Sequence, residues 1–235
     1  MYKGRGPRGS APPWEAMPSP LILGKSRLEA LGDGVFSIAM TLLVLKLEVP
    51  ELMHHQSNEA MLAQLLALGP AFATFVVTFL IAGGFWQLHH LTFHLIRHVD
   101  TLMVWMNLVF LMFVALLPFS AGLMSHLLVH PVSQLFYAGN LLAVALSLNV
   151  CWHYSKWRGF TSGTEQDMVV AIRIGAPVAA FAAALITAAI FPLYSWVPVP
   201  VCLAGGLIAE RRRKKLTRAG EGGGDQPDDP AEAEA

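Results

Sequence analysis

The chain has 235 residues, of which 54% are hydrophobic and only 14% are Asp, Glu, Lys or Arg. Soluble domains are usually close to a quarter charged, so this composition excludes an ordinary soluble protein and indicates an integral membrane protein. The formal net charge of zero hides a strong segregation of charge along the chain.

Six apolar segments are long enough, or nearly so, to cross a bilayer, which needs roughly 20 residues per helix. They cover residues 28–48, 65–92, 101–124, 132–153, 169–191 and 194–209. The second is long enough to extend beyond the membrane, and Pro198 and Pro200 should bend the last or stand at its start. The predicted fold class is an all-α integral membrane protein with six transmembrane helices per subunit.

Basic residues gather on one side of these predicted spans. Lys and Arg precede the first span, lie in the links after the second and fourth, and follow the sixth, whereas the links after the third and fifth carry none. The link after the first span has only Lys46 at its edge. Because cytoplasmic loops are enriched in Lys and Arg, we expect both termini to be cytoplasmic.

The two ends of the chain are expected to be disordered and cytoplasmic. Residues 1–26 are rich in Gly, Pro and Ser and lack the apolar core of a cleavable signal peptide. Residues 210–235 run from a basic cluster, RRRKK, into a tail rich in Gly, Pro and acidic residues. Residues 27–209 then form the transmembrane domain.

The first span, RLEALGDGVFSIAMTLLVL, has charged residues that a plain anchor would not need. An ionisable side chain at membrane depth is a functional-site candidate, which applies to Asp33. The alternative is a structural clasp that fixes this helix to its neighbours, and the position of Asp33 near the interface favours it. Residues at i, i+3, i+4 and i+7 share a helix face, so one stripe contains Gly34, Ser37, Ile38, Thr41, Leu42 and Leu45.

The second span ends in a histidine-rich stretch, FWQLHHLTFHLIRHVD. His90, His94 and His98 are four residues apart and would share a helix face, as a metal site requires. With Asp100 as the one nearby carboxylate and no nearby Cys, we expect structural hydrogen bonds and no metal. The chain has no Gly-x-Ser-x-Gly elbow and no His-Glu-x-x-His pair, so we expect no catalytic residues, no enzyme activity and no cofactor.

Two stretches of the sequence resemble the lysosomal potassium channel family, transmembrane protein 175 and its bacterial relatives. The first helix of that family opens with Arg-x-x-x-Phe-Ser-Asp; Arg27 and Asp33 match it, and Leu31 and Gly32 replace the Phe and Ser. The stretch over residues 85–124 is similar at more positions: Trp86, His89, His90, Asp100, Asn107 and the Leu-Leu-Pro-Phe that ends at Phe119. The resemblance covers the first three spans, and the later spans follow it in number and spacing.

The resemblance implies a homotetramer with the first helix of each subunit lining the pore, in place of the carbonyl filter of ordinary potassium channels. Ile38 corresponds to the narrowest ring, Leu42 and Leu45 to further apolar pore positions, and Thr41 to a ring linked to potassium preference. The residues that would brace the pore helix are Arg27, Asp33, Trp86, His89, His90 and Asn107.

Physical chemistry is consistent with this implied pore. Four Ile38 side chains would form an apolar constriction that gates by dewetting, and a single ring of Thr41 hydroxyls would favour K⁺ over Na⁺ only modestly. Without the resemblance, the same stripe is typical of a surface that packs against a neighbouring helix, because small and hydroxyl residues favour helix contacts in lipid.

We therefore expect a potassium-permeable channel for monovalent cations, a multi-pass homotetramer in the lipid bilayer of the plasma membrane with no nucleic-acid partner. The alternatives are a proton-conducting channel or a proton-coupled secondary transporter, with Asp33 and the histidines as a proton relay. A transporter of this kind would be expected to show an inverted repeat, which the sequence does not. A non-conducting membrane scaffold is the third alternative.

Overall fold

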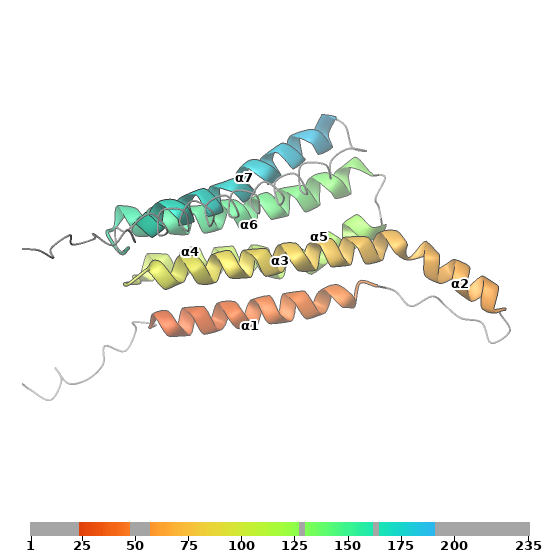
Figure 1. The fold of residues 1–235 in the computed structure, drawn as a ribbon, viewed down its shortest axis with the longest axis horizontal. Helices are drawn as coiled ribbons and strands as arrows, with labels where there is room; N and C mark the ends of the chain where they lie inside the picture. The colour runs from red at the N-terminus through yellow and green to blue at the C-terminus, as the bar shows by residue number, and fades with distance from the viewer. Residues whose placement is uncertain (1–23, 48–56, 127–129, 162–164, 191–235) are drawn as a thin grey trace, which may run out of the picture.

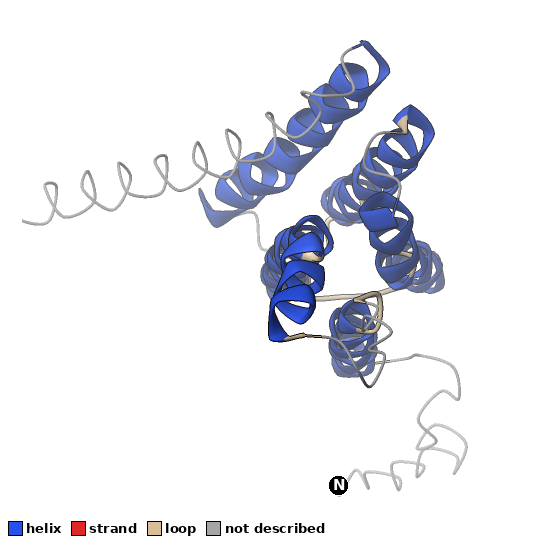
Figure 2. Ribbon diagram, turned by 90° about the vertical axis from the view of Figure 1, so that its right-hand side faces the viewer, coloured by secondary structure: helices blue, strands red, loops and turns tan. Residues whose placement is uncertain are grey.

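The computed structural model describes residues 24–47, 57–126, 130–161 and 165–190. These parts of the chain are almost entirely helical, as Figures 1 and 2 show from two directions. The helices are α1 (Lys25–Val44), α2 (Asn58–Ala67), α3 (Gly69–Leu95), α4 (Thr101–Ala115), α5 (Leu117–His126), α6 (Pro131–Trp157) and α7 (Glu165–Ile190).

Four stretches of helix are long and apolar enough to cross a membrane: residues 69–95, 101–125, 131–157 and 168–190. They correspond to the second to fifth predicted spans. The first predicted span corresponds to α1, which is as long as a span but begins with Lys25, Arg27, Glu29 and Asp33 in its first nine residues. The sixth predicted span, 194–209, lies outside the described residues, as do residues 1–23 and 210–235.

Prolines explain two helix boundaries that the hydropathy pattern does not reveal. The second span starts later than predicted, because α3 begins at Gly69 and has Pro70 in its first turn, where the missing N–H costs nothing. The preceding α2 is a separate helix capped by Ser57, whose hydroxyl accepts from the Ala60 N–H at 3.3 Å. The third span is divided at Leu116 into α4 and α5, because Pro118 cannot donate a hydrogen bond to the preceding turn.

The core lies where α1 packs against α3, α4 and α5 and where α6 packs against α4, α5 and α7. From α1 it receives the buried side chains of Phe36, Ala39 and Leu43. Buried polar pairs join the longer helices within this apolar core. The hydroxyls of Thr78 in α3 and Tyr137 in α6 are 2.8 Å apart, so a single hydrogen bond ties these two helices together.

The basic ends of several helices meet at one end of the bundle, on the left of Figure 1. The Lys25 ammonium at the start of α1 donates to the His94 carbonyl near the end of α3, at 3.3 Å. The Arg97 N–H, just after α3, donates to the Phe160 carbonyl, just after α6, at 2.8 Å. The links that the sequence predicts to be cytoplasmic therefore lie together.

Asp100 holds this end of the bundle together by bonding to both α4 and α6. One carboxylate oxygen accepts from the Met103 N–H at 2.8 Å and caps α4, and the other accepts from the Tyr154 hydroxyl at 2.6 Å. The Arg158 guanidinium lies 3.6 Å away. Partial burial raises the pKa of Asp100, but these two hydrogen bonds and the positive charge outweigh it and hold the pKa below its ordinary value.

This lowered pKa predicts a loss of stability in acid. Because the folded protein holds Asp100 ionised more strongly than the unfolded chain does, its contribution is present above pH 3.8, the ordinary value, and disappears as the pH falls through the lower folded value. Thermal unfolding in detergent should show a smaller drop in midpoint below pH 3.8 for Asp100→Asn than for the unchanged protein. Equal drops in the two proteins would contradict this assignment.

Gly159 ends α6 in the left-handed backbone region, with φ of 70°. The Gly159 N–H donates to the Lys156 carbonyl and the Phe160 N–H donates to the Ser155 carbonyl, which is the Schellman arrangement. Gly159→Ala should destabilise the protein by about 1 kcal/mol, because a side chain is strained at this φ. The matched change Gly175→Ala within α7, where an added Cβ has open space, should raise the unfolding midpoint instead.

Candidate functional site

Helix α1 has two distinct faces. One face is buried in the bundle and consists of Leu28, Gly32, Phe36, Ala39 and Leu43. The opposite face is exposed along its whole length, and it is the stripe predicted from the sequence: Gly34, Ser37, Ile38, Thr41, Leu42 and Leu45. We call this set the outward face of α1. Ile38 is 61% exposed and Leu45 is 71% exposed, as are large apolar side chains on the outer faces of other helices, such as Leu80 on α3. What distinguishes the outward face of α1 is that it also carries Gly34 and the hydroxyls of Ser37 and Thr41.

Thr41 presents acceptor oxygen lone pairs on the outward face. Its hydroxyl lies 2.9 Å from the Ile38 carbonyl and 3.1 Å from the Ser37 carbonyl, so its single proton is donated to the backbone of α1. A hydroxyl has one proton and two lone pairs. The oxygen of Thr41 is therefore left as an acceptor toward the outside of the subunit, which is the role that a ligand of a cation needs.

Asp33 is fixed to α3 beside the outward face. Its carboxylate accepts a hydrogen bond from the indole N–H of Trp86 at 2.8 Å, and both residues are exposed. The ring of His90, one turn further along α3, stacks against Trp86 with centroids 6.2 Å apart. Three residues proposed from the sequence as braces for α1 therefore lie together. The side chain of Arg27 is exposed, and its guanidinium makes no hydrogen bond or ion pair within the described part of the chain.

A second contact locks the buried face of α1 through His89. Its Nε2 lies 2.9 Å from Oδ1 of Asn107 in α4, and both side chains are buried. The imidazole ring is parallel to the Phe110 ring at 5.2 Å and lies 4.4 Å from the Phe93 ring. Gly32 of α1 lies against this clamped ring, because a Cβ added there would be 2.7 Å from Cε1 of His89.

Proteins similar to this chain help to interpret its buried His–Asn pair and its outward hydroxyl stripe. Residues 27–118 match the family model described as endosomal/lysosomal potassium channel TMEM175. A crystal structure of a lysosomal potassium-selective channel TMEM175 homolog from Chamaesiphon minutus superposes with a TM-score of 0.67 and 28% identity, covering 80% of this chain and 97% of that one. The chain is a relative of the TMEM175 channels.

Curated sequences give the same relationship. A potassium channel of Chamaesiphon minutus is 37% identical over 134 residues, which are 55% of this chain and 64% of that protein. A potassium channel of Streptomyces collinus is 34% identical over 54% of this chain and 62% of that protein. The mouse endosomal/lysosomal proton channel TMEM175 is 34% identical over 41% of this chain and 20% of that protein. The chain therefore spans less than two thirds of these curated relatives.

One part of the histidine prediction for this TMEM175 relative is wrong. His98 does not share a helix face with His90 and His94, because α3 ends at Leu95. From Ile96 the chain is extended, and it forms a bridge with Thr161 in place of another helical turn. Within the described residues, no group of three or more His, Cys, Asp or Glu side chains is placed to hold a metal ion.

Two polar pairs between helices, one buried and one partly buried, were not singled out from the sequence. The Asn140 amide of α6 donates to the Ser120 hydroxyl of α5 at 3.0 Å, and the Asn149 amide of α6 donates to the Ile174 carbonyl of α7 at 2.8 Å. The only sign of them in the sequence is an Asn within an apolar span. Inside a membrane such a side chain needs a hydrogen-bond partner on a neighbouring helix. That signal does not say which residue the partner is.

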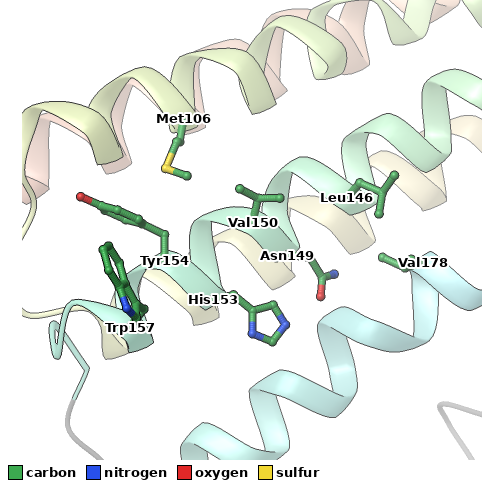
Figure 3. A pocket seen from close by; sticks show the side chains of 8 residues that line it. All are labelled: Met106, Leu146, Asn149, Val150, His153, Tyr154, Trp157 and Val178. Atoms are coloured by element: carbon green, nitrogen blue, oxygen red, sulfur yellow. The ribbon is translucent and has the colours of Figure 1, made fainter.

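An apolar groove of about 600 Å³ runs along α6 between α4 and α7 (Figure 3). Its polar side chains include those of Asn149 and His153, both from α6. The lining comes from α4, α6 and α7 and contains no residue of α1, so this groove is separate from the outward face: Met106, Leu146, Asn149, Val150, His153, Tyr154, Trp157 and Val178.

Proposed function

We propose that the chain assembles as a homotetrameric, potassium-permeable cation channel of the plasma membrane, with the outward face of α1 lining the pore. The observation that carries this proposal is the exposure of that face. A helix that buries one side in its own bundle and leaves hydroxyl and branched apolar groups outside needs a second environment for them, and a water-filled path between four copies provides one. Relatives named potassium channels, and one solved channel, support the choice.

In this proposal Ile38 forms the constriction. Four isoleucine side chains around an axis make a ring that water wets poorly, so ions pass only when the ring widens. Leu42 and Leu45 continue the apolar lining toward the far end of α1. Thr41 lies about 4.5 Å along the axis from Ile38, since each residue of a helix rises about 1.5 Å. Its outward oxygen would replace part of the hydration of an ion next to the constriction.

The contacts around Asp33 and His89 would set the rotation of α1. The Trp86–Asp33 hydrogen bond holds one edge of the helix, and the His89 ring against Gly32 holds the neighbouring, buried side. A rotation of α1 about its axis would break one of them, so Ile38 stays directed outward. In this proposal Arg27 and His90 take part in the same bracing at the basic end of the bundle, which we place in the cytoplasm with both termini.

A second candidate function is proton conduction, because the vertebrate relatives are named proton channels. Asp33 and His90 flank the outward face of α1 and are both exposed, so they are the titratable groups through which protons would pass. A reversal potential that follows the pH gradient, and does not follow the potassium gradient, would favour this function over the first.

The test of the proposed function is the reversal potential of the purified protein in planar bilayers between KCl and NaCl. We expect a cation-selective current that modestly favours K⁺, and we expect Thr41→Val, which keeps the shape but removes the oxygen, to shift the reversal potential toward zero. Ser147→Ala, which removes a hydroxyl from α6 away from the outward face, is the matched control and should leave it unchanged. Absence of unitary currents from tetrameric protein would refute the proposal.

A further inference from the structure

The apolar groove along α6 changes in polarity from one end to the other (Figure 3). Leu146 and Val178 line one end, and Tyr154 and Trp157 line the other, which is the basic end of the bundle. His153 lies one turn before Trp157; it is exposed and makes no hydrogen bond with any residue that the structure describes. A ligand that matches this gradient has a long apolar part and a polar group at one end.

The length and position of the groove match one leaflet of a bilayer. The stretch of α6 from Leu146 to Trp157 is about 16 Å long, because each residue of a helix rises about 1.5 Å. Half of a hydrocarbon core of about 30 Å is about 15 Å. Trp157 is 78% exposed, and tryptophan is enriched at the level of the lipid headgroups. An acyl chain from the leaflet on the basic side would therefore run along the groove and end near Leu146.

A cation is fixed at the polar end of this groove. The Tyr154 hydroxyl donates to Oδ2 of Asp100 at 2.6 Å, and Nη2 of Arg158 lies 3.6 Å from the same oxygen. The Arg158 guanidinium also lies over the Phe160 ring, 5.5 Å from its centroid. These contacts hold the guanidinium next to the tip of Tyr154, a residue that lines the groove, while the Arg158 side chain stays 47% exposed.

Asp100 leaves most of the hydrogen-bonding capacity of Arg158 unused. Its two carboxylate oxygens already accept from the Met103 N–H and the Tyr154 hydroxyl, and 3.6 Å is long for a hydrogen bond. A guanidinium has five N–H donors in a planar fork that matches a phosphate. Lys156 is exposed in the same turn and makes no ion pair with any residue that the structure describes, so it adds a second positive charge.

We propose that the groove binds an anionic phospholipid, whose phosphate accepts hydrogen bonds from Arg158 and one of whose acyl chains lies along α6 as far as Leu146. His153 donates to an ester carbonyl between these two contacts. Basic sites between membrane helices suit anionic headgroups in this way. The bound lipid lies between α4 and α7, which both pack on α6. Because no residue of α1 lines the groove, this inference does not depend on the proposed channel function.

The experiment compares phosphatidylglycerol with phosphatidylcholine of the same acyl chains, added to the full-length protein in detergent. Native mass spectrometry counts the lipids that stay bound, and thermal unfolding measures the stabilisation that binding brings. We expect phosphatidylglycerol to bind about tenfold more tightly, because the choline cation is repelled by Arg158 and Lys156, and to raise the unfolding midpoint more. Inorganic phosphate, which lacks an acyl chain, should leave the midpoint unchanged.

Two variants separate the headgroup contact from the acyl-chain contact. Arg158→Gln should weaken phosphatidylglycerol binding about tenfold, the size expected for one charge-assisted hydrogen bond, and Arg158→Lys should lose less. Val150→Trp fills the middle of the groove and should abolish lipid retention while leaving the Arg158–Asp100 pair in place. Ile172→Trp, the matched control, enlarges an exposed apolar side chain of α7 that does not line the groove, and it should leave binding unchanged.

Three results would overturn the inference. Equal retention of the two lipids would mean that Arg158 does not select the headgroup, and full retention by Val150→Trp would mean that no acyl chain occupies the groove. A rise in midpoint with inorganic phosphate as large as that with phosphatidylglycerol would show a site for free phosphate. If Arg158→Gln does not fold, the lipid comparison and Val150→Trp still decide. None of these readouts measures current, so failure here leaves the channel proposal standing.

Discussion

Replacing Ile38 with alanine is expected to raise the unitary conductance roughly three- to tenfold, because the ring of four side chains that narrows the proposed pore would lose most of its apolar bulk. The side chain is 61% exposed on the outward face, so its removal leaves no cavity in the subunit core and the fold should be unaffected. Planar-bilayer recordings of the purified variant, beside the unchanged protein, measure the conductance directly.

Ile172 provides the matched control for this experiment. It is 64% exposed on α7, so Ile172→Ala removes the same group from an equally exposed position far from α1 in the sequence. Its conductance should equal that of the unchanged protein. A conductance of Ile38→Ala that equals or falls below that of the control would show that the outward face of α1 does not line the narrow part of a pore.

Gly32→Ala is expected to lower the free energy of unfolding by about 1–3 kcal/mol, since overpacking in a filled core forces neighbours to move. The added Cβ would be 2.7 Å from Cε1 of His89. That ring cannot simply swing aside, because Asn107 bonds to its Nε2 and Phe110 lies parallel to it. The expected readout is a lower midpoint of thermal unfolding in detergent, together with slower assembly or altered conductance if α1 is displaced.

Gly34→Ala tests whether the effect belongs to the contact or to the loss of a helical glycine. An added Cβ at Gly34 has no atom within 4 Å, and the residue is exposed on the outward face. Alanine should stabilise the helix there by about 0.5–1 kcal/mol, because glycine loses more conformational freedom on folding. Equal midpoints for the two variants would mean that His89 yields easily and does not hold α1.

The outward face of α1 shows what local periodicity can predict and what it cannot. The spacing of Gly34, Ser37, Ile38, Thr41 and Leu45 defines a common helix face without any knowledge of the fold. The same pattern could not say whether that face points into the bundle or away from it, because small and hydroxyl residues suit both. Its exposure follows from the opposite side, where Phe36 and its neighbours on α1 meet the buried surfaces of α3 and α4.

The histidine stretch shows where a prediction from local periodicity fails. Four-residue spacing predicted one helical face for His90, His94 and His98, but the chain leaves the helix at Ile96. The reason lies far away in the sequence, since the Arg97 N–H donates a hydrogen bond to the Phe160 carbonyl in the link after α6. A local pattern carries no information about such a distant competitor for the backbone. The Thr78–Tyr137 and Ser120–Asn140 pairs were hidden for the same reason.

What the sequence alone determined is what depends on composition and on near neighbours along the chain. Low charge and long apolar runs determine a membrane protein, the distribution of Lys and Arg predicts its orientation, and short motifs reveal its TMEM175 relatives. The tertiary structure decided which face of α1 is buried, where the helices break and which polar groups pair. These features are set by packing between residues far apart in the chain, and that packing exists only once the bundle has formed.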